Sequence, residues 1–325
     1  MTSPELDVLS RFPTPLRGTP AFLGNHGGFS GAQLWRVDAR VGVFCLKAWP
    51  IAGPSTTELV WIHHLLEKAS VLEFVPRVMV ASDGASVLAH QDRLWELATW
   101  LPGRADYTLA PSAERLEAAC AALARLHQIW AATDVKSDTC PAVVRREDSW
   151  RRWRDLLQTG WRPTLAARSP YVQACEQLMQ LIEQQIDDVP RILTPWRSRP
   201  LPLQPCVCDL WHDHVLFMDA AVSGFIDFGS AKIDHVAVDL ARLLGSLVGN
   251  DAALWDVGLN AYARFRSLSA EERALARDLD RTGTISAATN WLRWLAFDKR
   301  QYERPANVLE RLNHLIGKLR EPFTA

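Results

Sequence analysis

The most informative segment of the chain is residues 206–230, which read C-V-C-D-L-W-H-D-H-V-L-F-M-D-A-A-V-S-G-F-I-D-F-G-S. Apolar runs at 215–217 and 224–226 flank a polar turn, a pattern that predicts a short β-hairpin. Asp209 and Asp227 stand at the edges of this pattern, so we expect both carboxylates at one end of two adjacent strands.

Paired carboxylates suit one kind of chemistry in particular. Kinase-type phosphoryl transfer uses one carboxylate to orient the acceptor hydroxyl and a second to hold Mg²⁺. Asp209 and Asp227 are therefore candidate groups for such a reaction.

The bulk composition describes a folded protein without a strong overall charge. A chain of 325 residues is long enough for two lobes. Its 36 Lys+Arg against 37 Asp+Glu exclude a field that would attract nucleic acid or an anionic membrane. The N-terminus shows no signal-peptide pattern, no apolar run is long enough to span a membrane, and the six cysteines follow no disulfide framework. These features predict a cytoplasmic protein with reduced thiols.

Secondary-structure patterns change character near residue 100. Before that point, β-patterned segments at 21–48 and 77–101 surround an amphipathic helix at 55–68 with a Ser55 N-cap. This order predicts a small, mostly antiparallel lobe.

Helical patterns dominate the rest of the chain, beginning with a helix at 112–127. Residues 195–205 contain repeated prolines, which we interpret as an irregular connection. We predict an α+β fold with a β-rich lobe at 1–100 and a mainly helical lobe at 101–325.

Candidate nucleotide-binding groups lie in the first lobe. The loop Gly27-Gly28-Phe29-Ser30-Gly31 joins two predicted strands, and glycines let backbone N–H groups approach phosphate oxygens. Lys47 follows the next strand, the place of the lysine that binds the α- and β-phosphates in kinases. Glu58, early in the following helix, is the preferred ion-pair partner of Lys47, with Glu67 as its competitor.

Motifs at five places occur in kinase order: Gly27 to Gly31, F-C-L-K ending at Lys47, L-A-R-L-H ending at His127, Asp209 followed by H-V-L-F from His214, and I-D-F-G around Asp227. Together they resemble the aminoglycoside phosphotransferase and choline kinase-like family, the small-molecule relatives of protein kinases. The resemblance spans roughly residues 20–250. It implies a bilobal protein-kinase-like fold with ATP in its cleft.

The resemblance also implies roles for particular residues. Asp209 matches the catalytic-loop aspartate that accepts the proton of the substrate hydroxyl or orients it. Asp227 matches the metal-binding aspartate. The hinge would lie near Thr99 and Leu101, whose backbone would meet the adenine.

The catalytic loop departs from the family pattern H-G-D-x-x-x-x-N, because the chain has Val207-Cys208-Asp209 and places His214 where the second metal-binding Asn would stand. Imidazole suits Mn²⁺ better than Mg²⁺. His214 is thus a candidate ligand of Mg²⁺ or Mn²⁺, a candidate phosphate contact when protonated, or a sign that one metal site is lost. His127 and Asp239 are interpreted as structural groups near this loop.

The acceptor is the least defined part of the prediction. Beyond residue 250, Lys+Arg slightly outnumber Asp+Glu, which argues mildly against polycationic aminoglycosides. A cluster of arginines with Trp150 and Trp153 is either a contact for an anionic or sugar-like acceptor or a solvated helix face; its members are Arg145, Arg146, Arg151, Arg152 and Arg154.

We therefore predict an ATP-dependent phosphotransferase that acts on a hydroxyl of a sugar-like, aminoglycoside-like or choline-like small molecule. Two alternatives stay open. The altered catalytic loop fits a pseudokinase-type scaffold that binds nucleotide without turnover. His212, Asp213 and His214 fit a metal-dependent hydrolase. The pair His212 and His214 alone would not suffice, because a catalytic zinc ion requires a third protein ligand.

Overall fold

The computed structural model describes residues 3–25, 31–131, 136–166, 169–302 and 304–321. The chain forms two compact units, each assembled from two segments of the sequence. Unit 1 comprises Met1–Ala110 and Asp213–Ala231, and unit 2 comprises Pro111–His212 and Lys232–Ala325. The segment around the predicted hairpin thus returns to unit 1, whereas the lobe boundary at residue 100 remains a prediction.

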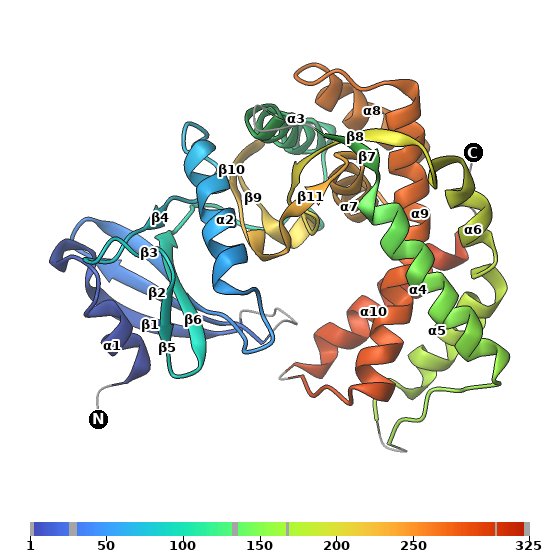
Figure 1. Ribbon diagram of the computed structural model, residues 1–325, viewed down its shortest axis with the longest axis horizontal. Helices are drawn as coiled ribbons and strands as arrows, with labels where there is room; N and C mark the ends of the chain where they lie inside the picture. Colours follow the sequence, from blue (N-terminus) through green and yellow to red (C-terminus); the bar gives the residue numbers. More distant parts are fainter. Residues whose placement is uncertain (1–2, 26–30, 132–135, 167–168, 303, 322–325) are drawn as a thin grey trace. The chain divides into compact units, whose positions relative to one another are not determined.

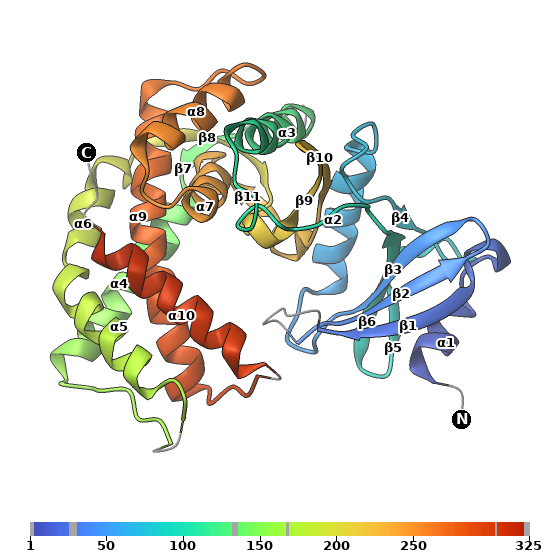
Figure 2. The ribbon, with the colours of Figure 1, turned by 180° about the vertical axis from the view of Figure 1, so that it is seen from behind.

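The described part of unit 1 contains an antiparallel sheet in the order β1-β2-β3-β6-β4, with β5 also paired to β6. The strands are β1 (Gly18–Gly24), β2 (Gln33–Ala39), β3 (Gly42–Ala48), β4 (Val78–Met79), β5 (Leu88–His90) and β6 (Arg93–Thr99). Alternate side chains on β2, β3 and β6 are buried, as the period of a half-buried strand requires. The helix α1 (Pro4–Leu9) contacts β1 and β5 and supplies Val8 and Leu9 to this core (Figure 2).

The helix α2 (Thr56–Lys68) confirms the helix predicted at 55–68 and lies beside the sheet (Figure 1). The side chain of Ser55 accepts a hydrogen bond from the Glu58 N–H, and the Glu58 carboxylate accepts one from the Ser55 N–H. This reciprocal capping box satisfies two donors that the first turn of a helix would otherwise leave unpaired. Leu59, Ile62 and Leu66 are among its buried side chains.

The predicted hairpin is confirmed by β9 (Val215–Met218) and β10 (Ala221–Phe225), which pair antiparallel. Asp219, at the turn, has a positive φ of 54°, a conformation that Asp and Asn tolerate better than most side chains. Two backbone hydrogen bonds fix the hairpin within unit 1. The Phe225 N–H donates to the Phe74 carbonyl, and the Arg104 N–H donates to the Phe217 carbonyl.

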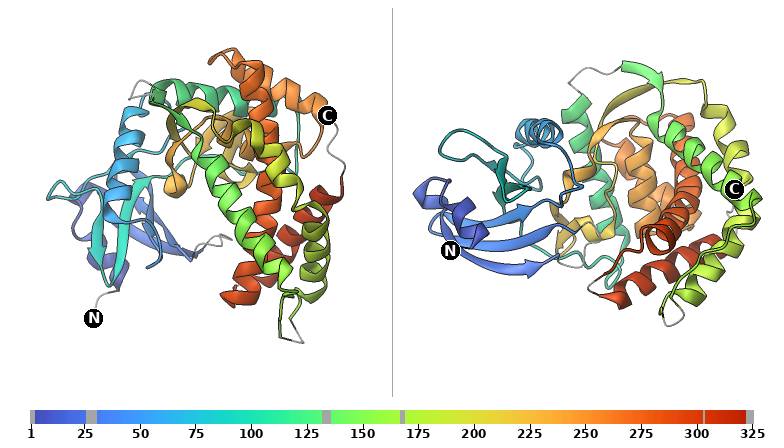
Figure 3. Two further views of the ribbon diagram at one scale, coloured as in Figure 1. Left: turned by 45° about the vertical axis from the view of Figure 1, so that its right-hand side comes forward. Right: turned by 60° about the horizontal axis from the view of Figure 1, so that its bottom comes forward.

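The described part of unit 2 is mainly helical (Figure 3). The helix α9 packs against α4, α5 and α10, and α5 also packs against α10. Its α-helices are α3 (Ala113–Ala131), α4 (Pro141–Gln158), α5 (Val172–Gln185), α6 (Asp188–Leu193), α7 (Ala237–Leu247), α8 (Ala252–Ala263), α9 (Ala270–Leu292) and α10 (Pro305–Arg320). A π-helical turn, Arg293–Phe297, continues α9. Short 3-10 turns occur in the chain at Thr14–Leu16, Thr194–Trp196, His212–His214 and Phe228–Ser230. Across the described ranges, none of the helices combines the length and apolarity of a membrane span.

The connection predicted at residues 195–205 is a strand from residue 200 onward, so the prediction is wrong for this part of the range. Pro200–Cys206 forms β8, which pairs with β7 (Lys136–Thr139) on one side and β11 (Lys232–Asp234) on the other. The partners divide the strand between them, because β7 pairs only with residues 200–203 and β11 only with 204–206. Each proline of β8 therefore pairs with only one neighbouring strand. Proline has no backbone N–H to donate, and a strand tolerates it where one edge is unpaired.

Candidate functional site

The centre of the candidate site in unit 1 is an ion pair between Lys47 and Asp227, which are far apart in the sequence. The Nζ atom of Lys47 donates to Oδ1 of Asp227 over 2.8 Å. Lys47 is on β3, and Asp227 follows β10 in a left-handed conformation (φ 60°, ψ 65°). This conformation is uncommon at residues other than glycine, and residues that adopt it are concentrated at functional sites.

The charges of this pair shift both pKa values. Burial lowers the pKa of Lys47, but the carboxylates of Asp227 and Glu96 more than offset this effect, so the pKa is raised. The ammonium of Lys47 lowers the pKa of Asp227 to about 2, against the opposing effect of burial and with a further contribution from His214. Both groups are therefore charged at neutral pH.

The ion pair gives a prediction for stability against pH. Because the pKa of Asp227 is lower in the folded chain than the ordinary value of 3.8, its contribution is complete above about pH 4 and is lost as pH falls towards 2. The Asp227 side chain is 41% exposed, so solvent screening limits the contribution to about 1 kcal/mol. Denaturant unfolding of wild type and Asp227→Asn between pH 2 and 6 measures it. The difference in unfolding free energy should vanish near pH 2; a constant difference contradicts the assignment.

Trp49 and Gly229 shape the surroundings of Lys47, and the sequence pattern singled out Gly229 only as part of the I-D-F-G motif. The Nζ atom of Lys47 lies 3.5 Å from the centroid of a Trp49 ring, a cation–π contact that restricts where the ammonium can point. A Cβ atom at Gly229 would come within 2.4 Å of the same indole. The glycine of the Asp-Phe-Gly sequence is therefore required for Trp49 to pack beneath the lysine.

Glu58 has a structural role in addition to the pairing with Lys47 that was predicted for it. Its carboxylate belongs to the capping box with Ser55, while Glu96 is directly opposite Lys47 in the β3–β6 pairing. Glu96 also accepts a hydrogen bond from Nε2 of His63 on α2 over 2.8 Å. The acidic residue opposite Lys47 is therefore Glu96 of β6, and it is hydrogen-bonded to His63 of α2. The proposed pairing of Lys47 with Glu58 stays a prediction.

His214 lies close to Asp227 at the base of the hairpin. Its Nε2 atom is 3.8 Å from Oδ2 of Asp227, and its carbonyl accepts a hydrogen bond from the Ile226 N–H. The carboxylate oxygen that does not bind Lys47 therefore faces an imidazole. These two side chains are therefore candidates for one nitrogen and one oxygen ligand of a divalent cation.

The remaining predicted nucleotide contacts are only partly described. Gly28, Phe29 and Ser30 lie outside the described residues, whereas Gly31 has a positive φ of 79° that favours glycine. Thr99 donates its backbone N–H to the Arg77 carbonyl, so that donor is already used within the sheet. If this segment is the hinge, Leu101 is the better candidate than Thr99 to donate to an adenine.

The catalytic-loop candidate, Asp209, lies in unit 2 beside Arg242 of α7. The Nε atom of Arg242 donates to Oδ1 of Asp209 over 2.9 Å. The arginine thereby fixes the orientation of the carboxylate while leaving 42% of the Asp209 side chain exposed. Arg242 stands one helical turn after Asp239, but no sequence motif marks it as a partner of Asp209.

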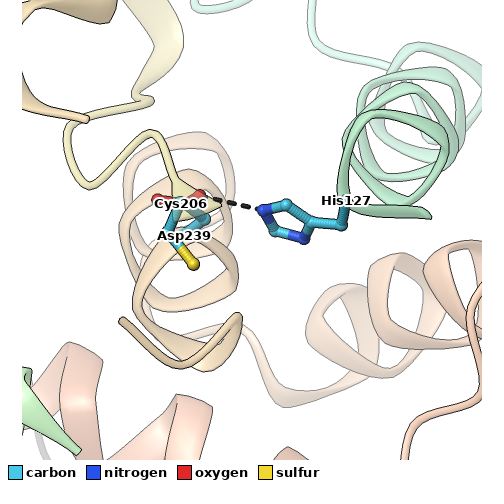
Figure 4. A group of neighbouring side chains, drawn as sticks. All are labelled: His127, Cys206 and Asp239. Atoms are coloured by element: carbon cyan, nitrogen blue, oxygen red, sulfur yellow. Dashed lines mark hydrogen bonds and ion pairs between the residues drawn. The ribbon is translucent and has the colours of Figure 1, made fainter. Parts of the chain in front are cut away.

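Asp239 and His127 brace the backbone of this loop, as their structural interpretation requires. Asp239, fully buried, accepts hydrogen bonds from the N–H groups of Val207 and Cys208 over 2.7 and 2.6 Å. His127 Nε2 lies 3.0 Å from the same carboxylate (Figure 4). Its Nδ1 lies 2.8 Å from the Tyr262 hydroxyl. Burial lowers the pKa of His127, so the imidazole is neutral and donates to Asp239 through Nε2.

The same residues form a group of potential metal ligands, His127, Cys206 and Asp239 (Figure 4). Both oxygens of Asp239 already accept backbone hydrogen bonds, and burial raises the pKa of the Cys206 thiol far above its usual range. A protonated thiol is a poor metal ligand. We therefore interpret this group as a brace for the loop.

Cys208 occupies a strained position and gives a second prediction. Its φ is 65°, in the left-handed region where glycine is favoured. We expect Cys208→Gly to stabilise the protein by about 0.5 kcal/mol, because relief of about 1 kcal/mol of strain exceeds the added chain entropy. Denaturant unfolding measures this effect. The matched control Cys206→Gly, in the buried end of β8, should destabilise; destabilisation by both variants refutes the account.

The arginine cluster on α4 is used mainly within the protein. Arg145 forms an ion pair with the buried Asp234, and Arg146 donates to the carbonyls of Ala142 and Leu279. Arg151 pairs with Glu147 and Asp148. These contacts favour the structural interpretation of the cluster over an acceptor-binding one.

The sequence of the chain is similar to a known family of phosphotransferases. The model of the phosphotransferase enzyme family matches residues 22–277. A homoserine kinase of Beijerinckia indica is 29% identical over 220 residues, which are 64% of this chain and 63% of that protein. A second, from Cupriavidus pinatubonensis, is 28% identical over 69% of this chain and 66% of its own length. The matched stretch spans slightly less than two thirds of these two relatives.

A solved structure of similar fold is spectinomycin phosphotransferase in complex with ADP and spectinomycin. It has a TM-score of 0.65 and 11% identity, with 97% of this chain and 96% of that chain covered. This likeness confirms the predicted α+β, protein-kinase-like fold. At this identity it says nothing about the substrate.

Proposed function

Since the chain belongs to the phosphotransferase enzyme family, we propose that it is an ATP-dependent kinase that phosphorylates a hydroxyl group of a small molecule. The observation that carries the proposal is the Lys47–Asp227 ion pair, which joins a lysine on β3 to the aspartate of an Asp-Phe-Gly sequence. These are the charged groups that kinase-type phosphoryl transfer requires for phosphates and metal.

Unit 1 would supply the nucleotide-binding groups. Lys47 would bind phosphate oxygens, with Trp49 and Glu96 limiting its orientation. Asp227 and His214 fit a divalent cation, because they offer a carboxylate and an imidazole to the same space. Such a cation, Mg²⁺ or Mn²⁺, would neutralise charge on the phosphate oxygens. The backbone near Leu101 would bind the adenine.

Unit 2 would supply Asp209. Its carboxylate would orient the acceptor hydroxyl and receive its proton as the oxygen attacks the γ-phosphorus. One O–P bond forms to the acceptor, the bond from the γ-phosphorus to the bridging oxygen breaks, and ADP leaves. Arg242 would keep the carboxylate in one orientation throughout.

One alternative is supported by a specific feature. The Asn position of the family motif holds His214, and the residues before Asp209 are valine and cysteine. A nucleotide-binding scaffold without turnover would tolerate these changes. The hydrolase alternative is weaker, because the group of three metal-donor side chains gathered in the described residues, His127, Cys206 and Asp239, includes neither His212 nor His214.

A thermal-shift titration with ATP tests the nucleotide half of the proposal. Ligand at about 100 times its Kd stabilises a protein by about 2.7 kcal/mol. We expect a rise in Tm that requires Mg²⁺ or Mn²⁺. A larger rise with Mn²⁺ would support His214 as a metal ligand, because imidazole suits Mn²⁺ better than Mg²⁺. No rise with either ion would contradict nucleotide binding and, with it, both the kinase and the scaffold.

A further inference from the structure

Three side chains connect Lys47 to the helix α2 and to the segment before β5. Glu96 is directly opposite Lys47 in the pairing of β3 with β6, so both side chains leave the same face of the sheet. The Oε2 atom of Glu96 lies 2.8 Å from Nε2 of His63 on α2. The Nδ1 atom of His63 lies 2.8 Å from the Ser86 hydroxyl. All of these residues belong to unit 1.

Hydrogen bonds hold the imidazole ring of His63 at both of its nitrogen atoms. Only 6% of the His63 side chain and 16% of the Glu96 side chain are exposed, so water competes little for either group. Whether the ring is neutral or protonated, Nε2 is the atom that donates, because an ionised carboxylate only accepts. The histidine therefore keeps the Glu96 carboxylate in one orientation beside the sheet.

Two carboxylates share the neutralisation of Lys47. Asp227 accepts a hydrogen bond from Nζ over 2.8 Å, and Glu96 is a second nearby negative charge that helps to raise the pKa of the lysine. In the proposed reaction Asp227 would also hold a divalent cation, which divides its charge between two positive groups. Glu96 would then be the carboxylate that balances Lys47 while the lysine binds phosphate.

We propose that His63 is a positioning residue for the binding of nucleotide phosphates: it holds Glu96 opposite Lys47 and thereby orients the ammonium group towards the phosphate oxygens. In protein kinases, the position of the helix after the lysine strand controls the lysine through a glutamate of that helix. Here α2 would act through a histidine and a glutamate of β6, in addition to any pairing of Lys47 with Glu58. The inference rests on the proposed kinase activity and deepens it.

Calorimetric titrations with ADP and with adenosine, each in the presence of Mg²⁺ or Mn²⁺, test this role. Adenosine lacks the phosphates, so its binding does not depend on Lys47. His63→Leu keeps the approximate size of the side chain and removes the donor to Glu96. We expect the Kd for ADP to rise about tenfold, the size expected for a hydrogen bond to a charged group, with the Kd for adenosine unchanged. A general defect of the fold would weaken both ligands alike.

Other substitutions provide the matched controls. His63→Gln carries an amide N–H near the place of Nε2 and should restore ADP binding. His64→Leu makes the same change at the neighbouring histidine, whose side chain is 67% exposed, and should leave both Kd values unchanged. If His63→Leu does not fold, Ser86→Ala removes the partner of Nδ1 and should weaken ADP binding about threefold without affecting adenosine.

A double variant determines whether His63 acts through Glu96. Glu96→Gln should weaken ADP binding about tenfold, and His63→Leu in that background should add little, because the two residues are coupled. Equal ADP binding in wild type and His63→Leu, a parallel loss of adenosine binding, or additive effects of the two substitutions overturns the role of His63 and leaves the proposed function standing. Absence of ADP binding by the wild type with either ion contradicts the proposed function and this role with it.

Discussion

Asp209→Ala is expected to lower kcat by about 10³-fold, because the acceptor hydroxyl loses the group that orients it and receives its proton. Nucleotide binding should be largely kept, since Lys47 and Asp227 belong to the other unit and form their own ion pair. A coupled assay of ADP formation measures kcat, and a thermal-shift titration with ATP measures nucleotide binding on the same preparation.

The control for this variant is Asp256→Ala. Asp256 is an exposed residue of α8 that pairs with Arg277, and it should keep wild-type kcat. Asp209→Asn keeps the shape and the hydrogen bond from Arg242 but not the proton acceptor, so it should be nearly as inactive as the alanine variant. Full turnover in Asp209→Ala would show that the role assigned to this residue is wrong.

Asp227→Asn has the second large expected effect, the loss of the metal-dependent rise in Tm on addition of ATP. An amide oxygen carries no net charge, so the variant would hold a divalent cation weakly, and Lys47 would lose the partner 2.8 Å away. The variant should still fold, since the ion pair contributes only about 1 kcal/mol.

Asp219→Asn is the matched control for this variant. It makes the same chemical change at the turn of the same hairpin, in a left-handed conformation that asparagine also tolerates. The metal-dependent rise should persist in Asp219→Asn. A rise that persists equally in Asp227→Asn would remove Asp227 from the metal site.

Local sequence patterns were sufficient for much of the fold. The hairpin was predictable because its two apolar runs flank a turn, and α2 was predictable because Ser55 and Glu58 make a capping box. The same box shows that the Glu58 carboxylate also caps the helix terminus, a second role beside its predicted pairing with Lys47.

Long-range pairings set the limit of the sequence-based prediction. Glu96 faces Lys47 only because of the register of β3 and β6, and Arg242 reaches Asp209 only because α7 packs near the end of β8. The prolines of β8 argued against a strand, yet β8 forms because β7 pairs with its first part and β11 with its last part. Each of these contacts depends on tertiary structure, and no local pattern specifies it.

The most direct test of the proposed kinase is detection of the phosphorylated product. Wild type and Asp209→Ala would be incubated with ATP, Mg²⁺ or Mn²⁺ and a panel of small hydroxylated acceptors that includes sugars, amino alcohols and hydroxy acids, and ³¹P NMR would be recorded. The account predicts a new phosphate monoester signal and equimolar ADP with wild type, both absent with Asp209→Ala. Metal-dependent ATP binding without any monoester would contradict the kinase and support a nucleotide-binding scaffold.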